Sequence, residues 1–473
     1  MDRREFLKLA GASSVGLLLA RNSSVRNRQT QSQDHHSRTT TTAVNPNTST
    51  APVVIGHGST PITMWVQLFG PAVIWFEEAA KAVSRRNPDV TITVLPLPYT
   101  SLQSKILPSI AAGTEADIMM AYDDWFYANE VSELFLDISK YVGGAKRIDS
   151  LAFPAALTAV SMPAGSVYYM PDLAGLRGCA LTVNVSQFEA KGINYLKLHT
   201  WADVVSAAQE LTEIKRGKMT RAGLSPITGV WQHLNLLQSW VWQLGGEFYD
   251  SASGQWKFST NEGKAAAQEL YDLFWKYKVS SFDLVTSGVN SNETTQFERG
   301  LVSSNLNGMW QVSSIEETVP AFRADAVATP LLTGAVRKVW DPGEISVITL
   351  SKRLSSDSTK LKACVDLLLE LTSASTTLGG FRSYSGSTAL KSVYKDRGAL
   401  LKERYGAVVD RIGSAVWPVA RYAQYHVSDM TTACTSLTRA LQKQISIKEA
   451  LADVDSYLNE QERLARQRLH LAA

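Results

Sequence analysis

The chain has 473 residues, of which 45% are hydrophobic and 19% are charged, a globular composition with room for two or three domains. It excludes a wholly disordered chain, a collagen-like fibre and a disulfide-stapled miniprotein. The formal net charge is +3, but residues 1–52 carry +4, so the chain from Val53 onward carries −1. Such a body lacks the positive surface that binding many phosphates requires, and we expect no nucleic-acid partner.

Residues 1–20 have the pattern of an export signal. Arg3, Arg4 and Phe6 precede an apolar run, Leu9–Ala20, that is too short for an ordinary membrane-spanning helix. The arginine pair resembles a twin-arginine signal peptide, which the twin-arginine translocase reads when it exports folded proteins. A basic segment for Sec export is the alternative. Leu18 stands where the cleavage pattern prefers a small residue, so the signal can also remain as an uncleaved anchor.

Residues 21–52 are rich in Ser, Thr, Asn and Gln and offer almost nothing apolar to bury. This composition predicts a disordered tether, with folding starting near Val53. Together, the signal and the tether predict a periplasmic protein or one held at the outer face of the cytoplasmic membrane.

The remaining chain alternates strand and helix patterns. The first five predicted elements are a strand around Ile62–Val66, a helix ending at Asn87-Pro88, a strand at Val90–Val94, a helix at Ser101–Ala112 and a buried strand at Ile118–Ala121. Later patterns predict strands at Leu181–Val183 and Ser346–Leu350, and helices at Trp201–Ile214, Glu262–Lys278, Thr359–Leu371, Met430–Gln442 and Ile447–Arg466. This alternation predicts an α/β protein with mostly parallel sheets flanked by helices. About 420 ordered residues exceed a single sheet, so we expect two lobes.

Catalytic and metal-binding motifs are missing from the sequence. Gly56-His57-Gly58-Ser59 does not continue into a dinucleotide-binding loop, because Pro61 occupies the position of the third glycine. The histidines considered as metal ligands lack zinc-site spacing: His57, His199, His233 and His426. The cysteines are odd in number and far apart, which allows at most one disulfide: Cys179, Cys364 and Cys434. We expect no metal and no cofactor.

Asp123 and Asp124 could in principle form the acid and base pair of a glycosidase. Adjacent residues at a strand end point apart, however, whereas that chemistry needs carboxyl groups roughly 5 to 9.5 Å apart across the sugar. We expect the two side chains to accept hydrogen bonds from a ligand or from the backbone.

Aromatic residues are abundant, with 12 Trp and 16 Tyr. Several follow predicted strands at the point where loops begin: Trp65, Tyr122, Trp125, Trp231, Trp310 and Trp340. Large rings suit the C–H faces of a pyranose, and neighbouring polar groups can bind its hydroxyls. Core or lobe packing is the alternative role for each of them.

Taken in order, short motifs over residues 60–465 resemble family 1 extracellular solute-binding proteins of ABC importers, the class that includes maltodextrin-binding proteins. The matching segments are Ile62-Thr63-Met64-Trp65, Phe76-Glu77 through Asn87-Pro88-Asp89-Val90, Ile110-Ala111-Ala112-Gly113 through Asp117-Ile118, Asn184 to Ile193, Thr200-Trp201-Ala202-Asp203, Leu244-Gly245-Gly246-Glu247-Phe248, Phe297-Glu298-Arg299-Gly300, Asn307-Gly308-Met309-Trp310 and Ile445 to Leu451. Ala116 departs from the family pattern, which has a proline there.

The resemblance implies a two-lobed periplasmic-binding-protein fold of type II, with a ligand cleft between α/β lobes. Lobe 1 would comprise residues 53–173 and 344–384, and lobe 2 residues 174–343 and 385–473. The ligand, a sugar or oligosaccharide, would be captured by lobe closure and delivered to the transmembrane subunits of an ABC permease.

Ligand contacts carried over from the family lie at strand ends facing the cleft. The predicted set is Trp65, Gln67, Tyr122, Asp123, Asp124, Trp231, Trp310, Trp340, Asp341, Arg382 and Tyr384. In the loop of Trp340 and Asp341 only Gly343 matches the family pattern. Two other functions remain as alternatives, a secreted carbohydrate-active enzyme and a sensor subunit that signals to a membrane kinase. Glycerol phosphate esters, polyols and peptides are the alternative ligands.

Overall fold

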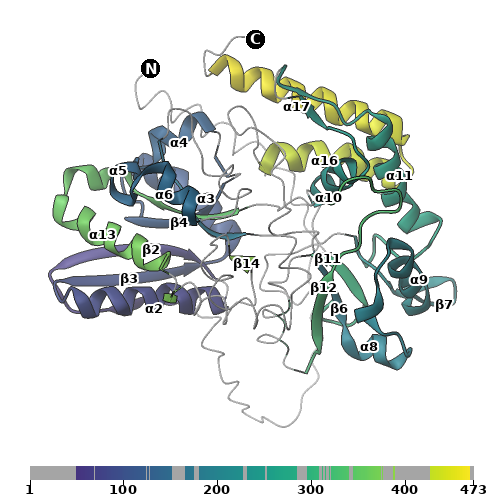
Figure 1. Ribbon diagram of the computed structural model, residues 1–473, viewed down its shortest axis with the longest axis horizontal. Coiled ribbons are helices and arrows are strands. Elements are labelled where there is room, and N and C mark those ends of the chain that lie inside the picture. The colour runs from purple at the N-terminus through teal and green to yellow at the C-terminus, as the bar shows by residue number, and fades with distance from the viewer. Residues whose placement is uncertain are drawn as a thin grey trace, which may run out of the picture.

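The computed structural model describes residues 50–68, 70–123, 125–126, 128–151, 166–174, 180–226, 232–250, 253–284, 296–307, 312, 315, 319, 321–339, 345–373, 375–376, 387–388 and 427–468. The expected export signal and nearly all of the expected tether therefore lie outside the described residues. Figure 1 shows two α/β lobes side by side. We use first lobe for the described residues within 50–174 and 345–388, and second lobe for those within 180–339 and 427–468.

A seven-stranded sheet forms the centre of the first lobe, in the order β1-β3-β2-β4-β13-β5-β14. Its strands are β1 (Val53–Ile55), β2 (Thr60–Gln67), β3 (Val90–Leu97), β4 (Ile118–Tyr122), β5 (Met170–Ala174), β13 (Ile345–Leu350) and β14 (Ser387–Thr388). Its helices are α2 (Gly70–Arg86), α3 (Tyr99–Ala112), α4 (Ala128–Leu134), α5 (Ser139–Val142), α6 (Gly144–Leu151) and α13 (Ser358–Leu371), with the 3₁₀ helix η4 (Lys352–Ser356). Because β14 pairs with β5, the first sheet extends beyond the expected lobe boundary at residue 384.

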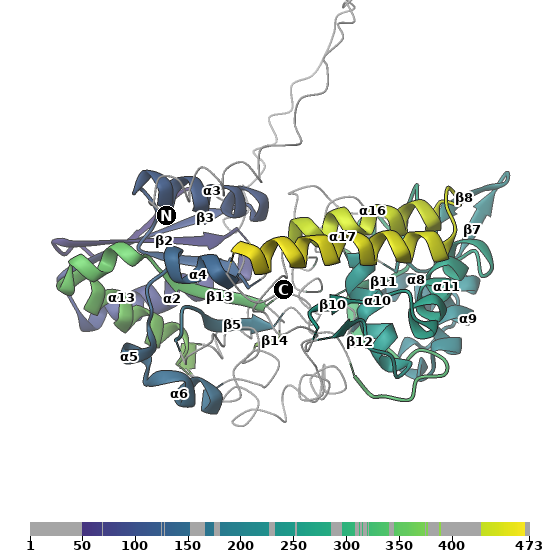
Figure 2. The same ribbon diagram turned by 90° about the horizontal axis from the view of Figure 1, so that it is seen from above.

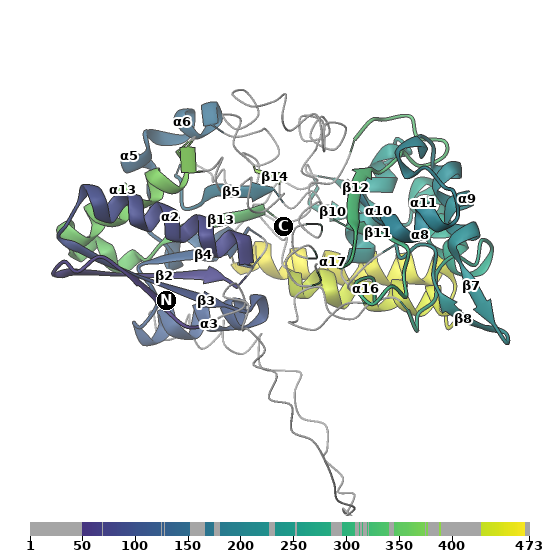
Figure 3. The same cartoon turned by 90° about the horizontal axis from the view of Figure 1, so that it is seen from below.

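Helices cover both faces of this sheet. In Figures 2 and 3, α3 lies on one face, and α2 and α13 lie on the other. Alternate residues of β2, Ile62 and Met64, are fully buried, as is Phe76 of α2. Gly113 ends α3 in the left-handed conformation, with a φ of 70° that glycine adopts without steric cost.

The expectation of mostly parallel sheets was wrong for the described strand pairs. Strand β2 runs parallel to β3 and β4, whereas β13 is antiparallel to both β4 and β5. Near the start of β13, Ser346 lies opposite Tyr122, at the edge where β4 ends. It reverses direction because the chain enters the first sheet from that edge, after it has built the second lobe.

The second lobe contains a three-stranded sheet in the order β11-β6-β12, with both pairs antiparallel. Its strands are β6 (Ala180–Asn184), β11 (Ser304–Asn307) and β12 (Ala324–Ala328), and separate hairpins are formed by β7 (Glu213–Lys215) with β8 (Lys218–Arg221) and by β9 (Tyr249–Asp250) with β10 (Gln255–Trp256). Its helices are α8 (Val185–Ala190), η3 (Tyr195–Lys197), α9 (Trp201–Leu211), α10 (Gln232–Gln243), α11 (Asn261–Trp275), α16 (Val427–Leu441) and α17 (Ile447–Arg468).

Helix α9 illustrates how local sequence sets the boundaries of an element. Thr200 and Asp203 form a capping box at its start, with side chain and backbone of each bonded to the other. The helix ends at Leu211, before the expected end at Ile214, because Glu213 and Ile214 enter the β7–β8 hairpin.

Helices α16 and α17 form an antiparallel pair over the second lobe (Figure 2). One stripe of α17 holds the β9–β10 hairpin and the residues that follow it. Asn459 accepts from the backbone N–H of Trp256 at 2.7 Å and donates to its carbonyl at 2.9 Å. Asp455 accepts from the backbone of Ser259 at 2.9 Å. The last helix therefore fixes a segment about 200 positions earlier in the chain.

Among the described helices, none combines the length and the apolar character that crossing a membrane requires. Cys364 and Cys434 are buried, and neither forms a disulfide among the described residues. Burial raises the pKa of the Cys434 thiol to about 12, so this cysteine stays protonated and unreactive at neutral pH.

Candidate ligand-binding site

Two predicted ligand contacts lie at the edge of the first sheet that is formed by the carboxyl ends of β2 and β4. Strands β2 and β4 run parallel with Trp65 opposite Met119, so Gln67 and Tyr122 end their strands at the same edge. The Tyr122 hydroxyl donates a hydrogen bond to Gln67 Oε1 at 2.6 Å, and both side chains are buried. The edge at which the resemblance implies a ligand therefore contains an ordered polar pair.

Three aromatic rings pack together at this edge. The ring centroids of Tyr99, Tyr122 and Trp125 lie 5.1 to 5.3 Å apart. Trp125 Nε1 donates to the Tyr99 hydroxyl at 3.0 Å. The motif comparison did not place Tyr99 in the site, although a signal was present: Tyr99 begins α3 two residues after β3 ends, at the same edge as β2 and β4.

The indole of Trp65 lies under helix α3. Lys105 Nζ is 4.7 Å from the ring centroid, a cation–π contact, and only 6% of Trp65 is exposed. Asp123, directly after β4, is likewise buried. We name Trp65, Gln67, Tyr99, Tyr122, Asp123 and Trp125 the strand-end cluster. Rings and polar atoms come together there from the ends of two strands, the residues after β4 and a helix N-terminus, which is the composition expected of a carbohydrate site.

The other predicted contacts lie outside the described residues and remain predictions. They are Asp124, Trp231, Trp310, Trp340, Asp341, Arg382 and Tyr384.

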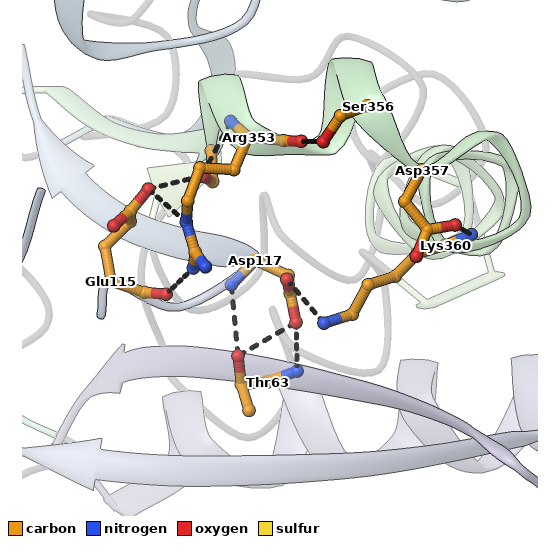
Figure 4. A network of polar contacts seen from close by, with 8 residues as sticks. Thr63, Glu115, Asp117, Arg353, Ser356, Asp357 and Lys360 are labelled. Atoms are coloured by element: carbon orange, nitrogen blue, oxygen red, sulfur yellow. Dashed lines mark hydrogen bonds and ion pairs between the residues drawn. The ribbon is translucent and has the colours of Figure 1, made fainter. Parts of the chain in front are cut away.

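The opposite end of β4 is held by a polar network, shown in Figure 4. Asp117 accepts from the backbone N–H and the hydroxyl of Thr63, at 2.8 and 2.9 Å, and pairs with Lys360 of α13 at 2.9 Å. Glu115 accepts from Arg353 Nε of η4 at 2.7 Å. The aspartate of the family-like motif therefore has a structural role here, joining β2, β4 and α13, and is not at the strand-end cluster.

The described residues contain no group of three or more His, Cys, Asp or Glu side chains that could hold a metal ion. Of the carboxylates, Asp123 alone belongs to the strand-end cluster, and its predicted neighbour Asp124 is not described. The described part of the strand-end cluster therefore contributes rings, one amide and one carboxylate.

The family model described as bacterial extracellular solute-binding protein matches residues 72–347, more than half of the chain. No curated protein matches the sequence. Among solved structures, a similar one is an ABC transporter solute-binding protein from Thermotoga lettingae bound with alpha-D-tagatose. It is 17% identical, with a TM-score of 0.69, and the match covers 85% of this chain and 100% of that chain.

Two further solved structures are similar. Maltose-bound MalE3 from T. maritima is 20% identical, with a TM-score of 0.65 and coverage of 85% of this chain and 99% of that chain. The GacH receptor of Streptomyces glaucescens, solved unliganded and in complex with acarbose, is 16% identical, with a TM-score of 0.67 and coverage of 86% and 99%. These similarities show a shared type II periplasmic-binding-protein fold. With the family match, they establish that the chain belongs to the bacterial extracellular solute-binding protein family.

Proposed function

We propose that this protein is the sugar-binding receptor of an ABC importer, which captures a sugar or oligosaccharide between its lobes and delivers it to a membrane permease. The main support for this proposal is that a chain of the extracellular solute-binding family has the strand-end cluster of aromatic and polar side chains. Family membership supports solute capture outside the cytoplasm. The cluster supports a ligand with both apolar faces and hydroxyl groups.

The chemistry of the cluster favours a carbohydrate over the other ligand classes. Phosphate esters favour a site with several cations, whereas the strand-end cluster contributes rings, one amide and one carboxylate. The described cation beside the cluster, Lys105, lies over the ring of Trp65. The similar structures carry names that mention tagatose, maltose and acarbose, ligands of those proteins. They set the order in which ligands should be tried.

Capture requires that the sugar make more contacts in the closed arrangement of the lobes than in the open one. A sugar favours the closed arrangement only if it bonds to both lobes at once, so the predicted contacts of the second lobe, Trp231 and Trp310, are needed beside those of the first. Each hydrogen bond contributes about 0.5 to 1.5 kcal/mol net, so several bonds and a stacked ring give roughly −8 kcal/mol, a micromolar affinity. We propose no catalytic step.

The N-terminal sequence supports export by the twin-arginine translocase and a site of action at the outer face of the membrane. Replacing Arg3 and Arg4 by Lys should leave the protein inside the cell. Export that continued unchanged would point to the Sec route, and it would leave the binding proposal intact.

A thermal-shift screen with the purified protein tests the ligand class. Maltose, maltotriose, mannobiose, tagatose and acarbose form the first panel, and glycerol phosphate and peptides form the control panel. A ligand at 100 times its dissociation constant stabilises the folded protein by about 2.7 kcal/mol, which shifts the melting temperature by several degrees. Shifts confined to the control panel would contradict the sugar assignment. Turnover of a sugar would show that the protein is an enzyme and not a receptor.

A further inference from the structure

The β7–β8 hairpin projects from the end of the second lobe that is farthest from the first lobe, in all three views (Figures 1–3). Its turn residues, Arg216 and Gly217, have φ values of 52° and 75°, which defines a tight type I′ turn. At Arg216 a non-glycine residue takes the left-handed conformation. The chain therefore reverses direction within two residues at the tip, away from the body of the protein (Figure 2).

Positive charge is concentrated at this tip. Residues 213–221 contain four cationic side chains and one anionic side chain, whereas the chain from Val53 onward carries a net charge of −1. Glu213 pairs with Arg221 at 2.7 Å at the base of the hairpin and approaches Lys215 at 3.6 Å. Arg216 and Lys218 are exposed, and the side chain of Lys215 is 73% exposed.

The arrangement of the cations has an energetic cost within the isolated protein. Lys215 and Lys218 lie directly opposite each other across the two strands, and Arg216 lies between them in the turn. Like charges in directly opposed positions destabilise a hairpin. An anionic partner that contacts the tip would relieve this repulsion.

An exposed apolar residue directly precedes the cations in the sequence. Ile214 is 56% exposed and pairs across the strands with Met219, on the hairpin face opposite that of Lys215 and Lys218. Basic side chains adjoining an exposed aliphatic group match the interface of a bilayer, where anionic headgroups lie above hydrocarbon. A purely acidic protein surface would satisfy the charges and would leave Ile214 exposed.

We propose that the tip of the β7–β8 hairpin (Ile214, Lys215, Arg216 and Lys218) docks the protein on an anionic phospholipid surface. The contact is weak and salt-dependent, because three cations act within a Debye length of the membrane. It orients the second lobe toward the bilayer and does not depend on the identity of the bound solute.

Lysine footprinting of the full-length protein tests the proposal. The protein is mixed with vesicles of phosphatidylcholine alone or with added phosphatidylglycerol, and lysine acetylation is measured by mass spectrometry. Anionic vesicles should lower the reactivity of Lys215 and Lys218, and added salt should restore it. Lys264 of α11 and Lys362 of α13, both exposed, serve as internal controls and should keep their reactivity.

A hairpin variant and a charge-matched control complete the test. Lys215→Thr, Arg216→Asn and Lys218→Thr together remove the cations and keep a foldable hairpin, because Asn-Gly favours the type I′ turn and Thr favours strands. The control carries Lys191→Gln, Lys264→Gln and Lys362→Gln. The hairpin variant should lose about 100-fold in partitioning to anionic vesicles relative to the control.

Three results would overturn the proposal. The first is equal reactivity of Lys215 and Lys218 in free and vesicle-bound protein, which would place the contact elsewhere. The second is equal partitioning of the two variants. The third is protection that requires the permease instead of lipid, which would identify an acidic protein surface as the partner.

Discussion

Tyr122 and Gln67 show what single residues contribute at the candidate site. Both were expected to contact a ligand because each follows a predicted strand. The ligand contact stays a prediction, and the two side chains bond to each other in a geometry that depends on the register of β2 and β4. A sequence pattern locates strand ends, and only the register decides which of them are neighbours.

Replacing Tyr122 by Phe removes the donor of this buried bond. Gln67 Oε1 then loses its donor, which costs about 1 to 3 kcal/mol of unfolding free energy. Urea denaturation of Tyr122→Phe measures the loss. The double variant Tyr122→Phe/Gln67→Leu should be less destabilised than the sum of the single changes, and strict additivity would show that the bond does not matter.

Glu462 of α17 is a buried carboxylate whose surroundings favour the neutral form. Tyr249 donates to it at 3.1 Å and Arg466 at 3.0 Å, yet burial outweighs these bonds and raises its pKa. The unfolded chain therefore loses the proton first as the pH rises. The contribution of Glu462 to stability falls from about pH 4.3 up through its folded pKa, and is constant above it.

Glu462→Gln should remove this pH dependence, because glutamine keeps the shape and an acceptor for Tyr249. Near pH 4 the variant and the natural protein should be about equally stable. The variant should gain relative stability as the pH approaches 7. Urea unfolding at a series of pH values measures the difference in unfolding free energy. If the variant instead becomes less stable than the natural protein as the pH rises, the ion pair with Arg466 outweighs burial.

At the scale of elements, the network around Asp117 joins parts of the first lobe that are far apart in the sequence. Strands β2 and β4 belong to the first pass of the chain, and α13 belongs to the return after the second lobe. The network stabilises the end of β4 opposite the strand-end cluster. The lobe is therefore complete only when the returning segment is in place.

Asp117→Ala should cost about 2 to 3 kcal/mol, because it removes a charged acceptor from Thr63 and the partner of Lys360. The control is Asp357→Ala, which removes only the cap of α13, where Asp357 accepts from the Lys360 backbone, and should cost about 1 kcal/mol. Denaturant midpoints of the two variants provide the comparison. Equal losses would mean that the network adds nothing beyond a helix cap.

Long elements could be predicted from the sequence because periodicity reports burial directly. Strand β2, helix α3 and strand β4 lie where alternation and helical spacing indicated. The β7–β8 hairpin was missed because its short strands lack a buried face and follow the helical pattern of α9. The direction of β13 in the first sheet could not be predicted from local patterns either, because it depends on the path of the chain between the lobes.

For the whole molecule, the ordered motifs together indicated the family, which the match over residues 72–347 establishes. The candidate site is harder to predict from sequence, because strand register and helix packing decide which side chains at the strand ends are neighbours. Trp65, Gln67, Tyr122 and Asp123 lie at one edge of the first sheet, and their buried state depends on α3 and Trp125. The central claim is that this edge, together with the second lobe, binds a sugar.

Titration calorimetry of the purified protein with the best sugar from the thermal-shift panel tests that claim most directly. We predict saturable binding of one sugar per chain at roughly −8 kcal/mol, with the sugar recovered unchanged. The absence of saturable heat for every sugar in the panel, with the protein folded, would contradict the account, and so would recovery of cleaved sugar.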